Sequence, residues 1–249
     1  MGAVDVNHGN CDLKVEILVG FFMMTIVKKV SQKTIHPWDL EPLQAAALQV
    51  KLARQVVRQS RKSLEDMATV AGIDTGYRNK TAYAAIVVLN LPDLRVLEKA
   101  TAAKPISFPY IPGLLSFREG PVVLEALDKL KSPPDLLMID GQGIAHPRRF
   151  GIACHIGLLT DIPSVGCAKT RLLGEYQELH RDRGSTAFLR ENGETLGAVV
   201  RTRTGVKPVF VSIGHLIDLN DSIRIILRCC RGYRLPEPIR RADQLSKKR

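Results

Sequence analysis

The order of the apolar segments between residues 67 and 168 places the strongest constraint on the fold of this chain. Three apolar runs, 67–74, 82–91 and 94–103, are joined by short turns, which predicts three antiparallel strands. The hydrophobic period then changes, and it predicts a helix at 118–131, a strand at 135–140, a helix at 149–160 and a strand at 163–168. The chain is therefore expected to be an α/β protein. Its mixed central sheet begins as an antiparallel meander, continues with parallel strands, and is flanked by helices.

This strand order matches the sheet of a ribonuclease H-like fold, in which the first and fourth strands lie side by side. Asp74 ends the first predicted strand and Asp140 ends the fourth, so we expect their carboxylates to be neighbours. Two carboxylates in a partly buried place repel each other and stay ionised when a cation lies between them. Oxygen ligands suit Mg²⁺, with Mn²⁺ as a substitute. An aspartate taken singly is better explained as a strand-end cap or a turn residue, and only several acids in suitable places favour the metal site.

A third acidic residue, Glu119, opens the helix predicted at 118–131. It is expected to complete the metal site or to orient an attacking water. A divalent cation at such a site neutralises a phosphate and activates water, so three acids in these places predict cleavage of phosphodiesters.

Two further side chains follow predicted strands. His215 follows an apolar run and a glycine, and it is a candidate to position water or to protonate a leaving oxygen. Lys169 follows the strand at 163–168 and is a candidate phosphate contact. The alternatives are a loop histidine with a satisfied hydrogen bond and an ordinary solvated lysine.

The rest of the chain carries weaker signals. A helix is predicted at 40–60, and residues 196–202 and 206–213 predict a hairpin. A last helix is expected at 220–231, and the basic segment after it is expected to be frayed. The sequence contains neither a repeat nor a low-complexity linker, which indicates one domain over residues 38–249.

Residues 1–37 are interpreted as an N-terminal extension. It is either disordered or the product of a start codon placed too far upstream, with Met23 or Met24 as the true start. Its apolar run, 15–27, is shorter than the roughly 20 residues that span a bilayer. We therefore expect no membrane partner, with a weak membrane anchor as the alternative.

The charge of the chain indicates its kind of partner. The formal net charge is +11, and an excess of that size is typical of proteins that bind a polyanion such as nucleic acid. An ordinary basic protein is the alternative. The five cysteines form no CxxC pair, which favours reduced core thiols in a cytoplasmic protein. We expect the protein to be a monomer.

The loop Pro109-Tyr110-Ile111-Pro112 is stiff because two prolines restrict its backbone. An exposed aromatic loop of this kind can insert between bases as a wedge. A rigid turn packed on the core is the alternative. Nearby glycines permit a close approach of the backbone, so main-chain groups there could read a base flipped out of its stack.

Taken together, these segments resemble the endonuclease V family, whose members are also called deoxyinosine 3′-endonucleases. The resemblance covers about residues 40–245 and rests on long motifs: PYIPGLLSFRE (109–119), IDGQGIAHPRRFGIA (139–153), VGCAKTRL (165–172), IGH (213–215) and GYRLPEPIRRAD (232–243). The family has a ribonuclease H-like fold, in agreement with the predicted strand order.

The resemblance implies roles for individual residues. Asp74 and Asp140 resemble the metal-binding aspartates of the family, Glu119 its catalytic glutamate and His215 its active-site histidine. Lys169 matches the lysine of the family's GVAK segment, and Pro109–Pro112 resembles the strand-separating wedge. The pocket around a flipped hypoxanthine would be formed by Gly113, Leu115, Gly141, His146, Gly151, Ile152 and Leu172.

The implied reaction is a Mg²⁺-dependent hydrolysis of DNA at the second phosphodiester bond 3′ to deoxyinosine. It would leave 3′-hydroxyl and 5′-phosphate ends and would initiate repair of deaminated adenine. A nuclease that acts on inosine in RNA is an alternative. A protein distinguishes RNA from DNA through contacts to the 2′-hydroxyl, and no motif here indicates whether such contacts exist. A non-catalytic nucleic-acid binding module is a third reading, which the retained acids disfavour.

Overall fold

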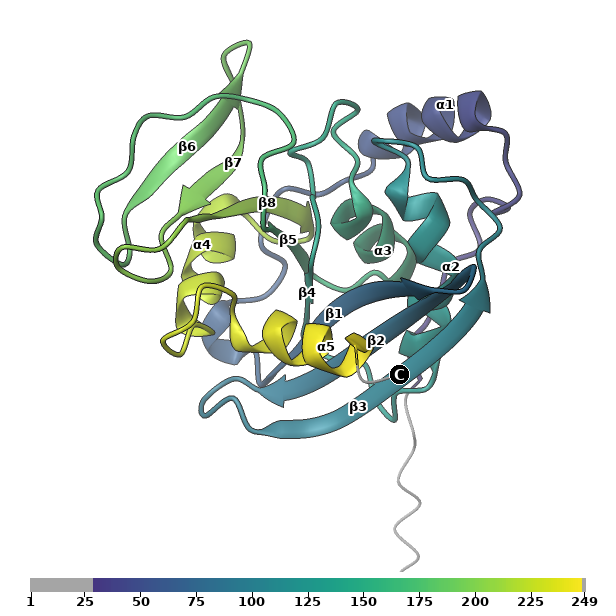
Figure 1. The fold of residues 1–249 in the computed structure, drawn as a ribbon, viewed down its shortest axis with the longest axis horizontal. Coiled ribbons are helices and arrows are strands. Elements are labelled where there is room, and N and C mark those ends of the chain that lie inside the picture. The colour runs from purple at the N-terminus through teal and green to yellow at the C-terminus, as the bar shows by residue number, and fades with distance from the viewer. Residues whose placement is uncertain (1–28, 248–249) are drawn as a thin grey trace, which may run out of the picture.

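In the computed structural model, which describes residues 29–247, the chain forms an eight-stranded mixed sheet with helices on both faces (Figure 1). The order of the strands is β3-β2-β1-β4-β5-β8-β7-β6. The strands are β1 (Thr69–Arg78), β2 (Thr81–Asn90), β3 (Val96–Pro105), β4 (Leu136–Ile139), β5 (Ser164–Ala168), β6 (Thr186–Glu191), β7 (Glu194–Val200) and β8 (Val209–His215). The α-helices are α1 (Pro42–Ala53), α2 (Leu115–Asp128), α3 (Ile152–Thr160), α4 (Leu219–Arg228) and α5 (Glu237–Lys247).

The pairing of strands confirms the expected ribonuclease H-like arrangement. Strands β1, β2 and β3 form the antiparallel meander, and β4 lies parallel to both β1 and β5. Ile73 of β1 pairs with Ile139 of β4, and the Asp140 amide donates to the Ile73 carbonyl at 3.0 Å. Asp74 follows Ile73 and Asp140 follows Ile139, so the two aspartates lie side by side on neighbouring strands.

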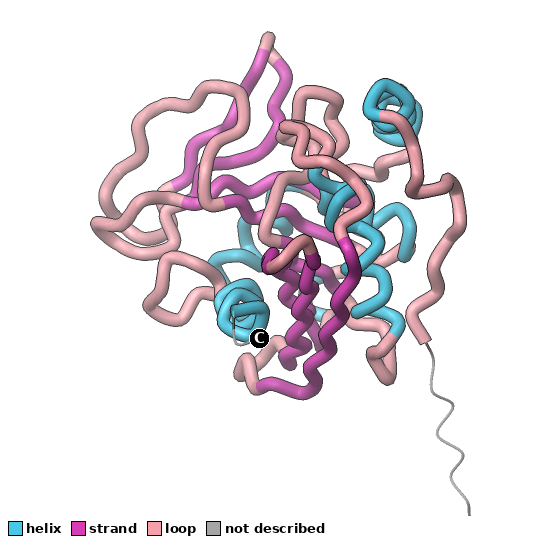
Figure 2. The backbone as a smooth tube through the Cα atoms, turned by 45° about the vertical axis from the view of Figure 1, so that its right-hand side comes forward, coloured by secondary structure: helices cyan, strands magenta, loops and turns pink. Residues whose placement is uncertain are grey.

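The alternation of side chains along the strands divides the core between two faces of the sheet. Val70 and Met138 point to the face covered by α4 and α5, where Ile225 and Ile239 are buried. Their neighbours along the strands, such as Ile73 and Ile139, face the helices α2 and α3. Figure 2 shows helices on both sides of the strands. Because side chains alternate along a strand, Asp74 and Asp140 belong to the α5 face.

Two predictions about helices were wrong. The C-terminal segment, expected to be frayed, forms α5, which packs against β1 and β2 (Figure 1). Ile239 and Ala242 form its buried stripe. The first helix ends at Ala53 instead of residue 60, because the chain after it leaves the helix to pair with the end of β8. There the Leu216 amide donates to the Val57 carbonyl at 2.8 Å.

The remaining predicted elements are present with shifted boundaries. The helix expected at 220–231 is α4, which ends at Arg228, and the predicted hairpin is the antiparallel pair β7–β8. Strand β6 was not predicted, and it pairs with β7 at the edge of the sheet.

Residues 29–37, which we assigned to an extension, lie against the core. Val30 is buried, and the Lys33 amide donates to the Leu159 carbonyl at 2.7 Å. The His36 ring is hydrogen-bonded to His155, Nε2 to Nε2, at 2.7 Å. Residues 1–28, which include the apolar run 15–27, lie outside the described residues. Among residues 29–247, none of the helices has the length and apolar character that crossing a bilayer requires.

The cysteines within the described range agree with the expectation of reduced thiols. Cys154, Cys167, Cys229 and Cys230 are all buried and unpaired. Cys11 lies outside the described residues.

Candidate active site

Three aspartates from three elements meet on the α5 face of the sheet. Asp74 comes from β1, Asp140 follows β4 and Asp243 comes from α5, and each offers a carboxylate oxygen within 4.8 Å of the other two. The pairing of β1 with β4 brings the first two together. Asp243 joins them because it lies one turn beyond Ile239, on the side of α5 that packs against the sheet.

Helix α5 also supplies a hydrogen bond to the cluster. The Ser246 hydroxyl donates to Asp74 Oδ2 at 2.5 Å. Burial raises the pKa of Asp74 to about 6, against the effect of this hydrogen bond, and the nearby Asp140 charge raises it further. A cation at this place would therefore stabilise the ionised form of Asp74.

Glu119, from the first turns of α2, lines the same cavity and is buried. The Tyr77 hydroxyl donates to Glu119 Oε1 at 2.6 Å and fixes the orientation of the carboxyl group. Burial raises the pKa of Glu119 to about 8, the Tyr77 hydrogen bond opposes this effect, and the charges of Asp74 and Asp140 add to it. The cavity that collects these acids has a volume of about 600 Å³.

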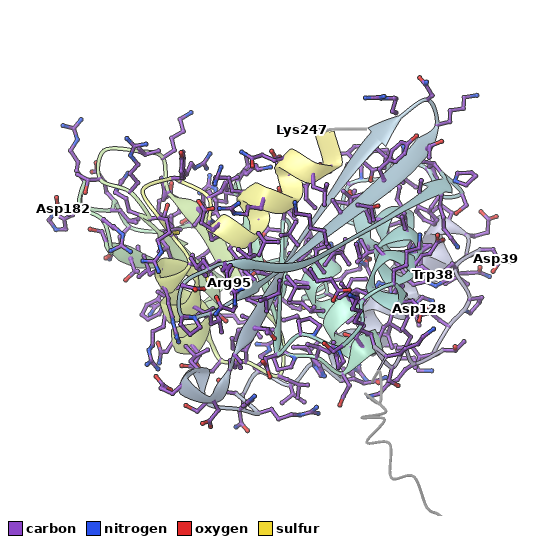
Figure 3. All side chains as sticks on the ribbon, turned by 90° about the horizontal axis from the view of Figure 1, so that it is seen from below. Trp38, Asp39, Arg95, Asp128, Asp182 and Lys247 are labelled. Carbon is purple, nitrogen blue, oxygen red and sulfur yellow. The ribbon has the colours of Figure 1, made fainter. Side chains whose placement is uncertain are left out.

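Two lysines neutralise part of the negative charge of these carboxylates. Lys169 Nζ lies 2.5 Å from Asp140 Oδ2 and 3.3 Å from Asp243 Oδ1. Burial opposes the charge on Lys169, but the Asp140 hydrogen bond outweighs it and leaves the pKa raised. Lys247 Nζ contacts Asp243 Oδ2 at 2.6 Å. Figure 3 shows Lys247 at the end of α5, beside the strands of the meander.

This set of side chains fits a divalent cation. The aspartates offer only oxygen atoms, which Mg²⁺ and Mn²⁺ prefer. Four carboxyl groups outnumber the three basic side chains that line the cavity with them, and the raised pKa values of Asp74 and Glu119 follow from burial without enough positive charge. Asp74, Asp140 and Asp243 are the residues placed to hold such an ion.

A second cavity adjoins the acidic one and shares Asp140 and Lys169 with it. Its volume is about 360 Å³. All seven residues that the resemblance assigned to a base pocket line it: Gly113, Leu115, Gly141, His146, Gly151, Ile152 and Leu172. The structure therefore places the predicted base pocket directly beside the carboxylates.

The predicted wedge lies at the rim of this second cavity. Tyr110, Ile111 and Pro112 line it, and Pro109 is exposed just before them. Tyr110 is 71% exposed, so its ring is not packed on the core. This position favours the wedge over the packed turn.

Hydrogen bonds of Gln49 and Arg148, which the sequence did not single out, and of His146, which it did, hold Gly113 at the second cavity. Gln49 of α1 accepts from Arg148 Nε at 2.6 Å, and Arg148 donates to the Gly113 carbonyl at 2.7 Å. His146 Nδ1 accepts from the Arg148 amide, so its Nε2–H donates to the same carbonyl. Burial lowers the pKa of His146 to about 4, which keeps this ring neutral.

His215 does not join the carboxylates, contrary to the prediction. It pairs with Ser164 at the start of β5, whereas Lys169 follows the other end of that strand. Its Nδ1 accepts from the Val57 amide at 3.2 Å, and burial lowers its pKa to about 4. The alternative reading, a histidine with a satisfied hydrogen bond, describes it. Asp243 is the acidic residue that we missed, although it ends the motif GYRLPEPIRRAD.

Comparisons with known proteins agree with this geometry. The family model for Endonuclease V matches residues 50–244. A protein from Methanothrix thermoacetophila named Endonuclease V is 51% identical over 217 residues, which cover 87% of this chain and 96% of that protein.

Solved structures with the same fold include the crystal structure of Endonuclease V from Streptomyces avermitilis. It is 41% identical, with a TM-score of 0.81, and the match covers 89% of this chain and 97% of that one. Endonuclease V from Ciona intestinalis was crystallised in complex with a 24mer DNA containing an inosine followed by a ribo-adenosine. It is 28% identical, with a TM-score of 0.71, over 83% of this chain and 96% of that one.

Proposed function

The chain belongs to the endonuclease V family, and on this premise we propose that it is a Mg²⁺-dependent endonuclease directed to deoxyinosine in DNA. It cleaves the second phosphodiester bond 3′ to the deoxyinosine and leaves 3′-hydroxyl and 5′-phosphate ends. This cleavage starts the repair of deaminated adenine. The observation that carries the proposal is the adjacency of two cavities, one acidic and one lined by the loop 110–113, which share Asp140 and Lys169.

The acidic cavity is the site of cleavage. Asp74, Asp140 and Asp243 would hold Mg²⁺, which when bound supplies positive charge to the scissile phosphate and lowers the pKa of water. Glu119, held by the Tyr77 hydroxyl, orients the attacking water and accepts its proton at the carboxylate. Lys169 is placed to contact a phosphate oxygen, because it lies between the two cavities.

The second cavity is the site of recognition. A base must leave its stack to be read on all its edges, and an apolar pocket with main-chain polar groups can receive it. Tyr110 at the rim inserts into the gap that the flipped base leaves. The neutral His146 and Arg148 both bind the Gly113 carbonyl and so hold the loop that joins the wedge to α2.

A gel cleavage assay tests this proposal. Matched single strands of DNA would each carry one deoxyinosine or one deoxyadenosine, with Mg²⁺ present. We expect a cut one nucleotide beyond deoxyinosine, no cut in the control strand, and loss of cleavage in EDTA. The Asp140→Asn variant should remain folded and inactive. Cleavage in EDTA, or full activity of Asp140→Asn, would contradict the metal assignment.

A second candidate is an endoribonuclease specific for inosine. The Ciona intestinalis relative was crystallised with a strand in which a ribo-adenosine follows the inosine, which favours keeping this candidate. The same assay with matched RNA strands separates the two. Cleavage of RNA alone would assign the protein to inosine in RNA, and binding without cleavage of either strand would favour a non-catalytic module.

A further inference from the structure

A third cavity adjoins the acidic one at the tip of the β1–β2 hairpin. It is an open notch of about 460 Å³, and three of its six lining residues are basic while none is acidic. The lining residues are Tyr77, Arg78, Asn79, Lys80, Ile106 and Arg118. Tyr77 and Arg78 also line the acidic cavity, so the two cavities are continuous.

The notch is built from three elements that are tied together. The Ile106 amide donates to the Lys80 carbonyl at 2.9 Å, which joins the hairpin turn to the segment after β3. Arg118 of α2 donates to the Phe108 carbonyl at 2.6 Å. Its guanidinium also lies 4.8 Å from the centre of the Tyr77 ring, a cation–π contact that supports this ring from one side.

Two basic side chains at this turn, those of Arg78 and Lys80, are free to contact a ligand. Within residues 29–247, the side chains of Arg78 and Lys80 form neither a hydrogen bond nor an ion pair, and both are exposed. Asn79 and Lys80 have φ angles of 47° and 60°, as a tight two-residue hairpin turn requires.

The three cavities follow one another in a fixed order. The base cavity shares Asp140 and Lys169 with the acidic cavity, which shares Tyr77 and Arg78 with the basic notch. If the base occupies the first cavity and the scissile phosphate the second, the same strand continues into the third. Since the proposed cut lies 3′ to the base, the segment in the notch lies 3′ to the cut.

We infer that the notch binds the nucleic-acid strand on the 3′ side of the scissile bond, with Arg78 and Lys80 on its phosphates and the Tyr77 ring against a sugar or base. This inference rests on the proposed function. Basic side chains beside an exposed aromatic ring are the usual surface for single-stranded nucleic acid, and 43% of Tyr77 is exposed.

The length of the strand beyond the cut provides the test. One substrate would be a single-stranded DNA with one deoxyinosine and about ten further nucleotides after the scissile bond. The other would end at the nucleotide that directly follows this bond. For the unmodified protein, we expect kcat/KM to be about tenfold lower on the short strand, and its dependence on log[salt] to be shallower by about 1.4, from two lost phosphate contacts.

A double variant assigns the effect to the turn. Arg78→Ala/Lys80→Ala should lower kcat/KM about tenfold on the long strand, and this penalty should shrink to about threefold or less on the short one. The control variant Lys99→Ala/Lys131→Ala removes the same charge from exposed residues of β3 and of the turn after α2. It should affect both strands equally and only slightly. Melting curves establish that each variant is folded.

The outcomes separate this inference from the proposed function. If the unmodified protein cuts neither inosine strand, the proposed function fails. If it cuts both strands equally well, or if the turn variant has the same penalty on both, the notch does not bind the 3′ segment and the inference is overturned. The comparison of strand lengths uses the unmodified protein, so it remains decisive even if the double variant misfolds.

Discussion

Single residues decide the chemistry of the acidic cavity, and Asp243 is the clearest case. It completes a group of three carboxylates and is contacted by Lys169 and Lys247. His215, the residue we expected there, pairs with the opposite end of β5. The contribution of a side chain at this site therefore follows from the element that carries it and not from the residue type alone.

A pair of substitutions distinguishes the two positions. Asp243→Ala should lower cleavage of an inosine strand roughly 100-fold or more, because it removes one of three carboxylates around the cation. His215→Gln should keep most of the activity and lower the free energy of unfolding by about 1 kcal/mol, because it weakens the bond from the Val57 amide. Cleavage rates and urea unfolding curves measure both effects. Loss of activity in a folded His215→Gln protein would contradict this assignment.

Among the elements, α5 has the greatest effect on the site, since it supplies Asp243, Ser246 and Lys247. Its close approach to β1 depends on Gly72, where a Cβ would overlap the backbone of Pro238. Gly72 is therefore required by the packing of a helix against the sheet and not by its own backbone angles.

The variant Gly72→Ala tests this packing. The added methyl group should push α5 away from β1, lower the free energy of unfolding by about 1–3 kcal/mol, and displace Asp243 from the other two aspartates. We expect the Mg²⁺ concentration for half-maximal cleavage to rise. Gly205→Ala is the control: Gly205 lies in the β7–β8 turn with a φ of 72°, so an alanine there should cost stability through backbone strain without moving α5 or changing the Mg²⁺ dependence. An unchanged Mg²⁺ dependence in Gly72→Ala would show that α5 does not position Asp243.

The elements also show how far the sequence alone could lead. The apolar runs and their turns predicted the meander, and the ribonuclease H-like order then placed Asp74 beside Asp140. Helix α5 was missed because charged and polar residues dominate it, and only Ile239 and Ala242 form its apolar stripe. Its contact with Gly72 joins distant parts of the chain, and no local pattern reveals such a contact.

The error at His215 has a related cause. A run of apolar residues before a histidine predicts a strand end, but it does not say at which edge of the sheet that end lies. Strand β8 is antiparallel to β5, and this orientation places His215 away from the carboxylates. The cavity residues Gly113 to Leu172, in contrast, came from motifs long enough to identify each position.

At the scale of the whole molecule, stability depends on pH through the acidic site. The raised pKa of Glu119, about 8, means that the folded protein keeps a proton that the unfolded chain has lost. Without a divalent cation, the contribution of Glu119 to the free energy of unfolding should therefore be lost as pH rises from its ordinary pKa of 4.5 to about 8, and the fall should be clearest above about pH 6.5. The pKa values of His146 and His215 are lowered to about 4. These histidines therefore make the free energy of unfolding rise with pH, but only between about pH 4 and their ordinary pKa of 6.5.

Binding of Mg²⁺ should reverse this loss, because a cation held by the three aspartates offsets their charge and favours the ionised form of the neighbouring Glu119. We expect Mg²⁺ to raise the melting temperature more at about pH 8.5 than at about pH 6. The titration of the histidines contributes equally with and without Mg²⁺, so it drops out of the difference between the two melting temperatures. In Glu119→Gln, the decline between about pH 6.5 and pH 8 should be much smaller without Mg²⁺. A decline that remains above about pH 8 comes from the buried cysteines, because burial raises their pKa values. A stabilisation by Mg²⁺ of equal size at both pH values would contradict the site as described.

Asp140 and Lys169 line both the acidic cavity and the base cavity, and this has a consequence for where the strand is cut. Both residues directly follow central strands, so the spacing between the cavities is a rigid property of the sheet. The number of nucleotides from the altered base to the break is then measured by the protein, whatever bases lie between. A repair pathway downstream would receive ends at one constant offset from every lesion.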